Sequence, residues 1–79
     1  MHARKMKSAY TKLKLGMTKD EVLKILGNPD SQRMSNGIEI FGWFDGEWVG
    51  IFRGGRIERR IVVEFENNLV IGFDGTNVN

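Results

Sequence analysis

The sequence contains no cysteine, and that absence excludes several kinds of chemistry together. A chain without thiols forms no disulfide, no thiolate metal site and no cysteine nucleophile, and it offers no thiol for lipid attachment. The single histidine, His2, lies at one end, so no imidazole is placed among other polar residues for acid–base catalysis. Metal-ligand spacings are missing as well. We therefore expect a protein that is not an enzyme and that holds neither a cofactor nor a metal.

Long apolar segments are missing too. No run approaches the ~18 apolar residues needed to cross a bilayer, so we expect no transmembrane segment. The basic residues near the N-terminus are not followed by the apolar region of a secretory signal peptide. What remains is 79 residues, 41% hydrophobic and 28% charged, which is typical of one small folded domain over residues 1–79.

Positive charge is concentrated in the first third of the chain. Residues 1–24 hold seven cationic side chains against two acidic ones, whereas residues 25–79 hold five against eight. A lysine-rich segment of this kind usually forms a solvated helix face. The alternative is a cytoplasmic protein that binds nucleic acid or another anion, with an affinity that falls steeply as salt rises. The candidate residues for that role are Lys5, Lys7, Lys12, Lys14, Arg53 and Arg56.

Helical periodicity marks the start of the chain. Met6, Tyr10 and Leu13 recur at the spacing of one helix face and predict a helix over about residues 3–15. Gly16 is expected to end it, because a residue without Cβ adopts a positive φ at little cost.

A second helix is expected over about residues 18–26. Thr18 and Glu21 have the spacing of a capping box, in which each side chain binds a backbone N–H of the other residue. Gly27 and Pro29 then prevent the helix from continuing.

From residue 38 onward the pattern changes to the alternation typical of β-strands. Strands over about 38–44 and 47–53 flank Asp45-Gly46, a dipeptide that favours two-residue hairpin turns, so we predict a tight turn there. Two further strands, about 57–66 and 69–74, are expected to form a closing hairpin.

A three-residue loop, Glu66-Asn67-Asn68, is predicted for the closing hairpin. It would place Val63 opposite Ile71 and Ile61 opposite Phe73, so that one face has only apolar partners. The expected fold is therefore α+β, with two N-terminal helices packed on a sheet of three or four antiparallel strands.

Both faces of the predicted sheet are apolar, although a sheet covered on one side should be polar on the other. The face with the larger aromatic side chains is the best candidate for contact with a protein partner, because Trp is enriched at binding hot spots. Neighbouring arginines can bind carboxylates at its edge. The candidate partner-binding residues are Phe41, Trp43, Trp48, Phe52, Arg53 and Arg56.

Two alternatives remain open for this aromatic face. In the first, the chain itself covers the face, with residues 29–36 or the N-terminal helix, because a small domain needs its aromatic residues for its core. Otherwise a second copy of the chain covers it in a homodimer, which makes the protein a self-associating structural domain.

A spaced motif of the helical region resembles the signature of the SmpA/OmlA (BamE-like) domains. It consists of Gly16-Met17-Thr18, Val22 and Leu26-Gly27-Asn28-Pro29. Trp43-Phe44 matches the aromatic strand that follows in that family. The closing hairpin of the family is matched by Val63-Glu64-Phe65 with Val70, so the resemblance spans roughly Tyr10 to Phe73.

The resemblance implies an α-α-β-β-β fold, which also occurs in repeats of β-lactamase inhibitor proteins, and a protein-binding role without catalysis. The outer-membrane members are bacterial lipoproteins of the β-barrel assembly machinery, so the resemblance implies the cell envelope. The signal peptide and lipidated cysteine of those members are missing here, which leaves a cytoplasmic location open. Residues 47–53 also predict a strand where those members often have a loop.

Overall fold

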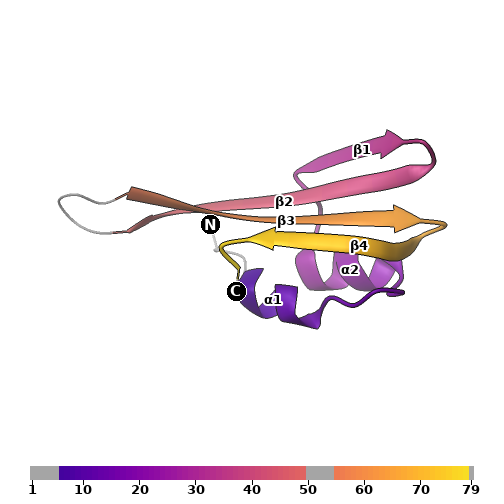
Figure 1. Cartoon of the computed structure of the whole chain (residues 1–79). Coiled ribbons are helices and arrows are strands. Elements are labelled where there is room, and N and C mark those ends of the chain that lie inside the picture. Colours follow the sequence, from indigo (N-terminus) through magenta and orange to yellow (C-terminus); the bar gives the residue numbers. More distant parts are fainter. Residues whose placement is uncertain (1–5, 50–54, 79) are drawn as a thin grey trace.

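The computed structural model describes the backbone of residues 6–49 and 55–78 and the side chains of residues 6–46 and 58–78. Two short helices, α1 (Met6–Lys12) and α2 (Lys19–Leu26), precede four strands. The strands are β1 (Ser31–Ser35), β2 (Ile38–Val49), β3 (Gly55–Glu66) and β4 (Leu69–Thr76). They form one antiparallel sheet in the order β1-β2-β3-β4, with both helices against the same face (Figure 1). The expected α+β fold is confirmed.

The second helix begins at the predicted capping box. Thr18 Oγ1 accepts a hydrogen bond from the Glu21 N–H at 3.2 Å, and Glu21 Oε1 accepts one from the Thr18 N–H at 2.9 Å. The bond from the Thr18 backbone, followed by the one to its side chain, holds the pKa of Glu21 below its usual value. Gly27 ends the helix with a φ of 78°, and its N–H donates to the Leu23 carbonyl at 2.7 Å.

The first helix is shorter than the predicted range of 3–15. It covers Met6–Lys12, and residues 3–5 lie outside the described part of the chain. Leu13 follows the helix but is still buried, and Gly16 has the expected positive φ of 86°. Within the described residues, no helix is long and apolar enough to cross a membrane.

The hydrophobic core lies between the helices and the sheet. Phe41 and Trp43 of β2 share the helix-facing side with Ile61, Val63 and Phe65 of β3, and all five side chains are buried. The Phe41 ring makes edge contacts with the rings of Trp43 and Phe65, at centroid distances of 6.1 and 5.2 Å. The helical region supplies the opposite side of the core, with Met6, Ala9, Leu13, Val22 and Leu26.

Trp43 connects the sheet to the end of α2. Its side chain has no solvent exposure, and its indole N–H donates to the Gly27 carbonyl at 3.0 Å. This bond satisfies a carbonyl that the end of the helix would otherwise leave without an intrahelical partner.

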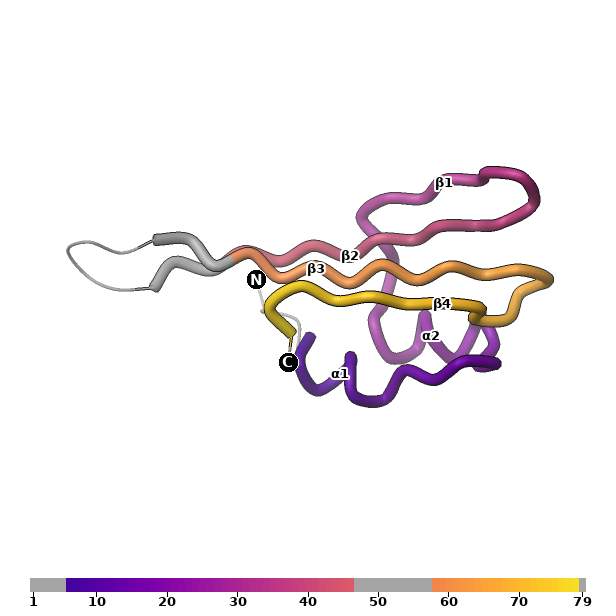
Figure 2. The backbone as a smooth tube through the Cα atoms, viewed as in Figure 1, coloured from indigo at the N-terminus to yellow at the C-terminus, as the bar shows by residue number. Residues whose placement is uncertain are grey.

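The segment between the helices lies along the outer edge of β4 (Figure 2). The Gly16 N–H donates to the Val70 carbonyl at 2.9 Å, and the Val70 N–H donates to the Met17 carbonyl at 2.8 Å. A third bond, 2.8 Å long, runs from the Lys19 N–H to the Asn68 carbonyl. The helical region is therefore joined to the sheet by backbone hydrogen bonds as well as by the core.

The predicted turn at Asp45-Gly46 is wrong. β2 continues through these two residues and pairs with β3 from Glu39 opposite Phe65 to Val49 opposite Gly55. The predicted strands 38–44 and 47–53 are thus one strand as far as Val49, and residues 50–53 lie outside the described part. Continuous pairing gives Trp43 an apolar partner, Ile61, on the buried face, whereas the predicted turn would have paired Trp43 with Trp48.

β1, the edge strand beside β2, comes from a segment that was not predicted as a strand. β1 pairs with residues 38–42 of β2 after a two-residue turn at Asn36-Gly37. Both turn residues have positive φ, 51° and 81°, which suits the twist of a hairpin.

The closing hairpin turns in two residues and not in the predicted three. Asn67 and Asn68 have φ values of 53° and 64°, and Glu66 pairs directly with Leu69. The predicted loop is therefore wrong. Asparagine tolerates the left-handed region that such a turn requires at both positions.

A β-bulge in β4 then shifts its pairing with β3 by one residue. Phe65 pairs with Val70 but Glu64 pairs with Gly72, so Ile71 is the extra residue. Val63 consequently lies opposite Phe73 and not opposite Ile71 as predicted, and Ile61 lies opposite Gly75 and not opposite Phe73. The bulge keeps Val70 buried and leaves Leu69 and Ile71 more than 40% exposed.

β2 and β3 extend beyond their neighbours in the sheet. β1 pairs with β2 only as far as Gly42, and β4 pairs with β3 only as far as Arg60. The described residues 45–49 and 55–59 form a two-stranded ribbon that projects away from the helices, which we call the arm (Figure 1). The molecule is accordingly elongated, with extents of 47, 23 and 22 Å.

Trp43→Phe tests the link between sheet and helix. The substitution removes the indole N–H and part of a fully buried ring, so we expect the free energy of unfolding to fall by about 2 kcal/mol. Urea denaturation followed by circular dichroism measures the change. Met34→Ala, at a side chain that is 65% exposed, is the control and should change stability by less than about 0.5 kcal/mol. Equal effects of the two substitutions would contradict the assignment of Trp43 to the core.

Glu21→Gln tests the capping box through its dependence on pH. Because the pKa of Glu21 is lowered by folding, its ionised form adds stability above the unfolded pKa, and this is lost as pH falls through the folded pKa. We expect Glu21→Gln to be less stable than the parent at pH 7 and equally stable at an acidic pH at which Glu21 is protonated in both the folded and the unfolded state. Urea titrations at both pH values measure this, with Asp20→Asn as a control that keeps the Thr18 bonds. A deficit independent of pH would refute the prediction.

Candidate protein-binding face

The sheet has a second face on the side away from the helices, which we call the outer face. Side chains alternate along a strand, so every second residue of β2 and β3 points to it. Ile40 and Phe44 of β2 and Val62 of β3 form an apolar cluster at its centre. Phe44 is 44% exposed, and the other two side chains are half-buried. The cluster is therefore open to contact from outside.

Gly42 gives the Phe44 ring its place on the outer face. A Cβ at position 42 would lie 3.1 Å from Cζ of Phe44 and 2.7 Å from Oγ of Ser31. The ring thus lies against the glycine backbone, and a larger residue would displace it. Arg60, opposite Phe44 on β3, places its guanidinium carbon 5.4 Å from the ring centroid, within the range of a cation–π contact.

The apolar cluster forms the floor of a hollow of about 310 Å³. Arg33 of β1 and Arg60 of β3 stand at its border, and Ser31 adds a hydroxyl group. An apolar floor with guanidinium groups at the rim suits a partner surface that combines apolar and carboxylate side chains.

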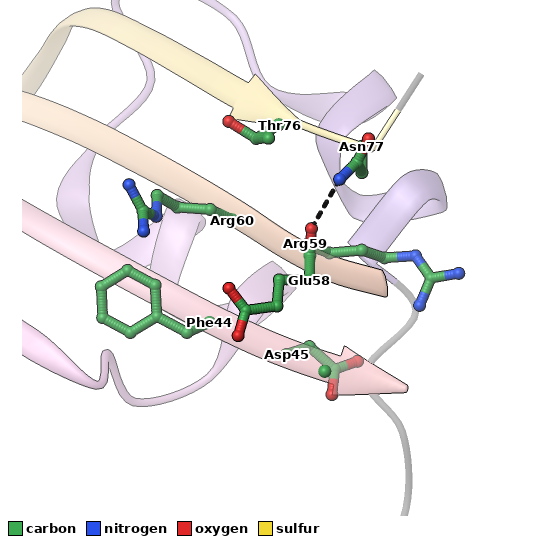
Figure 3. Close-up of a pocket in the computed structure, with 8 residues that line it drawn as sticks. Phe44, Asp45, Glu58, Arg59, Arg60, Thr76 and Asn77 are labelled. Carbon is green, nitrogen blue, oxygen red and sulfur yellow. Dashed lines mark hydrogen bonds between the residues drawn. The ribbon is translucent and has the colours of Figure 1, made fainter. Parts of the chain in front are cut away.

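At the two places where β1 and β4 stop pairing with the longer strands, a side chain bonds to the backbone of the neighbouring strand. Asp30, just before β1, accepts a hydrogen bond from the Phe44 N–H at 2.7 Å. Asn77, just after β4, donates to the Glu58 carbonyl at 2.8 Å (Figure 3). Beside Asn77, where β4 stops, acidic and basic side chains including Arg60 line a second hollow of about 500 Å³.

The structure places the predicted partner-binding residues differently from the expectation. Phe41 is 5% exposed and Trp43 is not exposed, so both side chains belong to the core and not to an accessible face. This agrees with the alternative in which the chain covers the face itself, although the cover is supplied by both helices. Trp48 and Arg56 lie on the arm with undescribed side chains, and residues 52 and 53 lie outside the described part.

The outer-face residues were missed because the pairing of β2 was assigned incorrectly. With the observed pairing, Phe41 and Trp43 have the apolar partners Val63 and Ile61. Phe44, by contrast, has the charged partner Arg60 on the other face. Comparing cross-strand partners, and not the size of the aromatic side chains, identifies which face is buried.

The lysines proposed for nucleic-acid or anion binding lie on the helical side of the molecule. Lys7, Lys12 and Lys14 are exposed on or just after α1, so they are separate from the outer face. Lys19 is paired with Glu39 at 2.8 Å and lies 5.5 Å from the Phe41 ring. Residues 5 and 53 are outside the described part, and binding to nucleic acid stays a prediction. In the described part, no three His, Cys, Asp or Glu residues are grouped so as to hold a metal ion.

Comparison with known proteins supports the fold. No family model matches the chain, and no curated protein matches it. Among solved structures, a Streptococcus mutans protein described as a candidate β-lactamase inhibitor protein matches with a TM-score of 0.58 and 25% sequence identity. The match covers 92% of this chain and 44% of that chain. This chain thus has a β-lactamase inhibitor protein-like fold and spans less than half the length of that protein.

Gly42→Ala tests the seat of the Phe44 ring. The new methyl group would lie 3.1 Å from the ring and 2.7 Å from Oγ of Ser31, so we expect a loss of about 1 kcal/mol in the free energy of unfolding. The same substitution in a Phe44→Ala background should cost less, by about 0.5 kcal/mol or more, because the ring is already gone. Urea denaturation of the four proteins of this cycle measures the coupling. Strict additivity would show that the ring does not depend on Gly42.

Proposed function

We propose that this chain is a non-catalytic protein-binding domain that contacts its partner through the outer face of the sheet. The observation that carries the proposal is the half-exposed cluster of Ile40, Phe44 and Val62, stacked beside Arg60. Aromatic and arginine side chains are the residue types enriched where protein interfaces gain most of their affinity.

The geometry of Phe44 favours binding in a second way. Gly42 and Arg60 hold the ring in place before any partner arrives. A side chain that is already ordered loses less conformational freedom on binding, so more of its contact energy contributes to affinity.

Within this role, the finer assignment that we propose is a domain of the SmpA/OmlA type in the bacterial cell envelope. Its support is the helical motif, whose residues have clear structural tasks here. Thr18 caps α2 and Gly27 ends it, and Val22 is fully buried. The fold shared with the Streptococcus mutans protein suggests a second class of partner, a β-lactamase.

The proposal is tested by binding measurements with both classes of partner. Purified β-lactamases and purified components of a β-barrel assembly machinery are titrated against the immobilised chain by biolayer interferometry. We expect one class to bind, and Phe44→Ala to weaken that binding by about tenfold or more.

The control is Met34→Ala, which removes a more exposed apolar side chain (65% against 44% for Phe44) from β1 on the other side of the sheet. It should change the affinity by less than about twofold. Binding that Phe44→Ala leaves intact would refute the outer face as the contact surface. Absence of binding to either class would refute these two assignments of the partner.

A further inference from the structure

The two outer strands of the sheet, β4 and β1, differ in whether their edges are covered. The edge of β4 is covered at Val70, whose backbone bonds to Gly16 and Met17. β1 pairs with β2 on one side, and no described strand lies on its other side (Figure 2). All five residues of β1 are exposed. An uncovered edge of this kind is a template for another strand.

The backbone groups that β1 offers at its edge follow from its hairpin with β2. Ser35 and Ile38 flank the two-residue turn, so they form the hydrogen-bonded pair that closes the hairpin. Because bonding alternates along an antiparallel strand, the backbone of Arg33 also faces β2, whereas Gln32 and Met34 face away from it. The N–H and carbonyl groups of these two residues are therefore available to a partner strand.

β1 lacks most of the features by which edge strands avoid pairing. Its five residues include no proline, and they pair with β2 without a bulge. Its one charge is Arg33, whose side chain makes no hydrogen bond or ion pair with any described residue. The guanidinium repels a basic strand, but it attracts a strand that carries a carboxylate at the opposite position.

The edge of β1 also gives access to the apolar cluster of the outer face. Ser31 lies opposite Gly42, so only small side chains separate the edge from the Phe44 ring. A Cβ at position 42 would lie 2.7 Å from Ser31 Oγ and 3.1 Å from Phe44 Cζ, so the hydroxyl and the tip of the ring meet over Gly42. A long apolar side chain opposite Ser31, on an added strand, can therefore pass over the serine and contact the ring.

We propose that β1 receives an extended segment of the protein partner as an additional antiparallel strand. The segment carries an acidic residue opposite Arg33 and, two positions later, a large apolar residue opposite Ser31, and both side chains lie on the outer face. Backbone bonds to Gln32 and Met34 supply affinity that does not depend on side chains, whereas the two outer-face contacts supply selectivity. The inference rests on the proposed function, because it names the part of the partner that this face receives.

A synthetic peptide tests strand addition directly. The sequence Thr-Thr-Glu-Thr-Phe-Thr, with acetylated and amidated ends, places its glutamate opposite Arg33 and its phenylalanine opposite Ser31. Titrated into the isotope-labelled chain and followed by NMR, it should shift the amide signals of residues 31–35 with a dissociation constant of about 1 mM or lower. Saturation should slow hydrogen exchange at the Gln32 and Met34 amides by about tenfold, because both become bonded.

Methylated peptides separate strand addition from a general attraction. In the proposed register the two threonines beside the glutamate bond to β1, whereas the N–H of the glutamate faces away from it. N-methylation of the threonine after the glutamate should therefore weaken binding by about tenfold or more. The matched control is N-methylation of the glutamate, which should change the affinity by less than about twofold.

Substitutions in β1 test the same bonds from the side of the domain. Met34→Pro removes an N–H that faces the uncovered edge, a position at which an edge strand tolerates proline. It should weaken peptide binding by about tenfold or more, whereas Met34→Ala, which keeps the N–H, should change it by less than about twofold. Arg33→Glu should weaken binding by about fivefold, and a peptide with lysine in place of glutamate should restore it. Circular dichroism shows whether each variant is folded.

The proposal is overturned if the peptide shifts no signal of β1 at ~5 mM, or if the two N-methylated peptides bind equally well. It is also overturned if raising the concentration of the chain alone shifts the Gln32 and Met34 amides, because a second copy then occupies the edge. Binding of a whole partner that Phe44→Ala weakens and Met34→Pro leaves unchanged would refute strand addition and keep the proposed function. Binding of the peptide, with neither class of partner bound, would support strand addition and refute those partners.

Discussion

The pairing of β2 with β3 is the constraint on which the rest of this structure depends. It places Phe41 and Trp43 beside Ile61 and Val63 on one face, and the helices cover that face because it removes the most apolar surface from water. Burying roughly 200 Å² of one Trp side chain contributes about 5 kcal/mol at 25 cal/mol per Å². The other face includes a glycine and the charged Arg60, whose burial would cost free energy. The same register therefore determines both the core and the exposed cluster.

Local signals in the sequence predicted the helical region well, and long-range pairing was where prediction failed. The Thr18–Glu21 cap and the stop at Gly27 depend on residues within one turn of each other, so spacing alone reveals them. Asp45-Gly46 has the composition of a turn but lies within a strand, because the turn would have denied Trp43 its partner on β3. Asn36-Gly37, with an equally strong turn composition, does form a hairpin turn. Composition cannot separate these two dipeptides, whereas the partners of the flanking residues can.

The buried face of the sheet was taken for an accessible one for the same reason, since Phe41 and Trp43 lie in the core. Large aromatic residues are common in cores and in interfaces. A chain of this size needs them for its core, because it has few other large apolar side chains to bury. What identifies the outer face is a relation between three residues: a glycine, the ring that lies against it and the arginine across the strand pair. Such a relation becomes visible only when the register is known.

The core joins segments from both ends of the described chain, and this has a consequence for biosynthesis. Tyr10 of α1 and Val78 both lie against Gly75, and the Thr18 backbone forms a bridge with Leu69. Neither contact exists until residues 69–78 have been made and have left the ribosome. The helices can form early, but part of their apolar surface stays uncovered until residues 69–78 have emerged, so the domain completes its fold only after its last strand has been made.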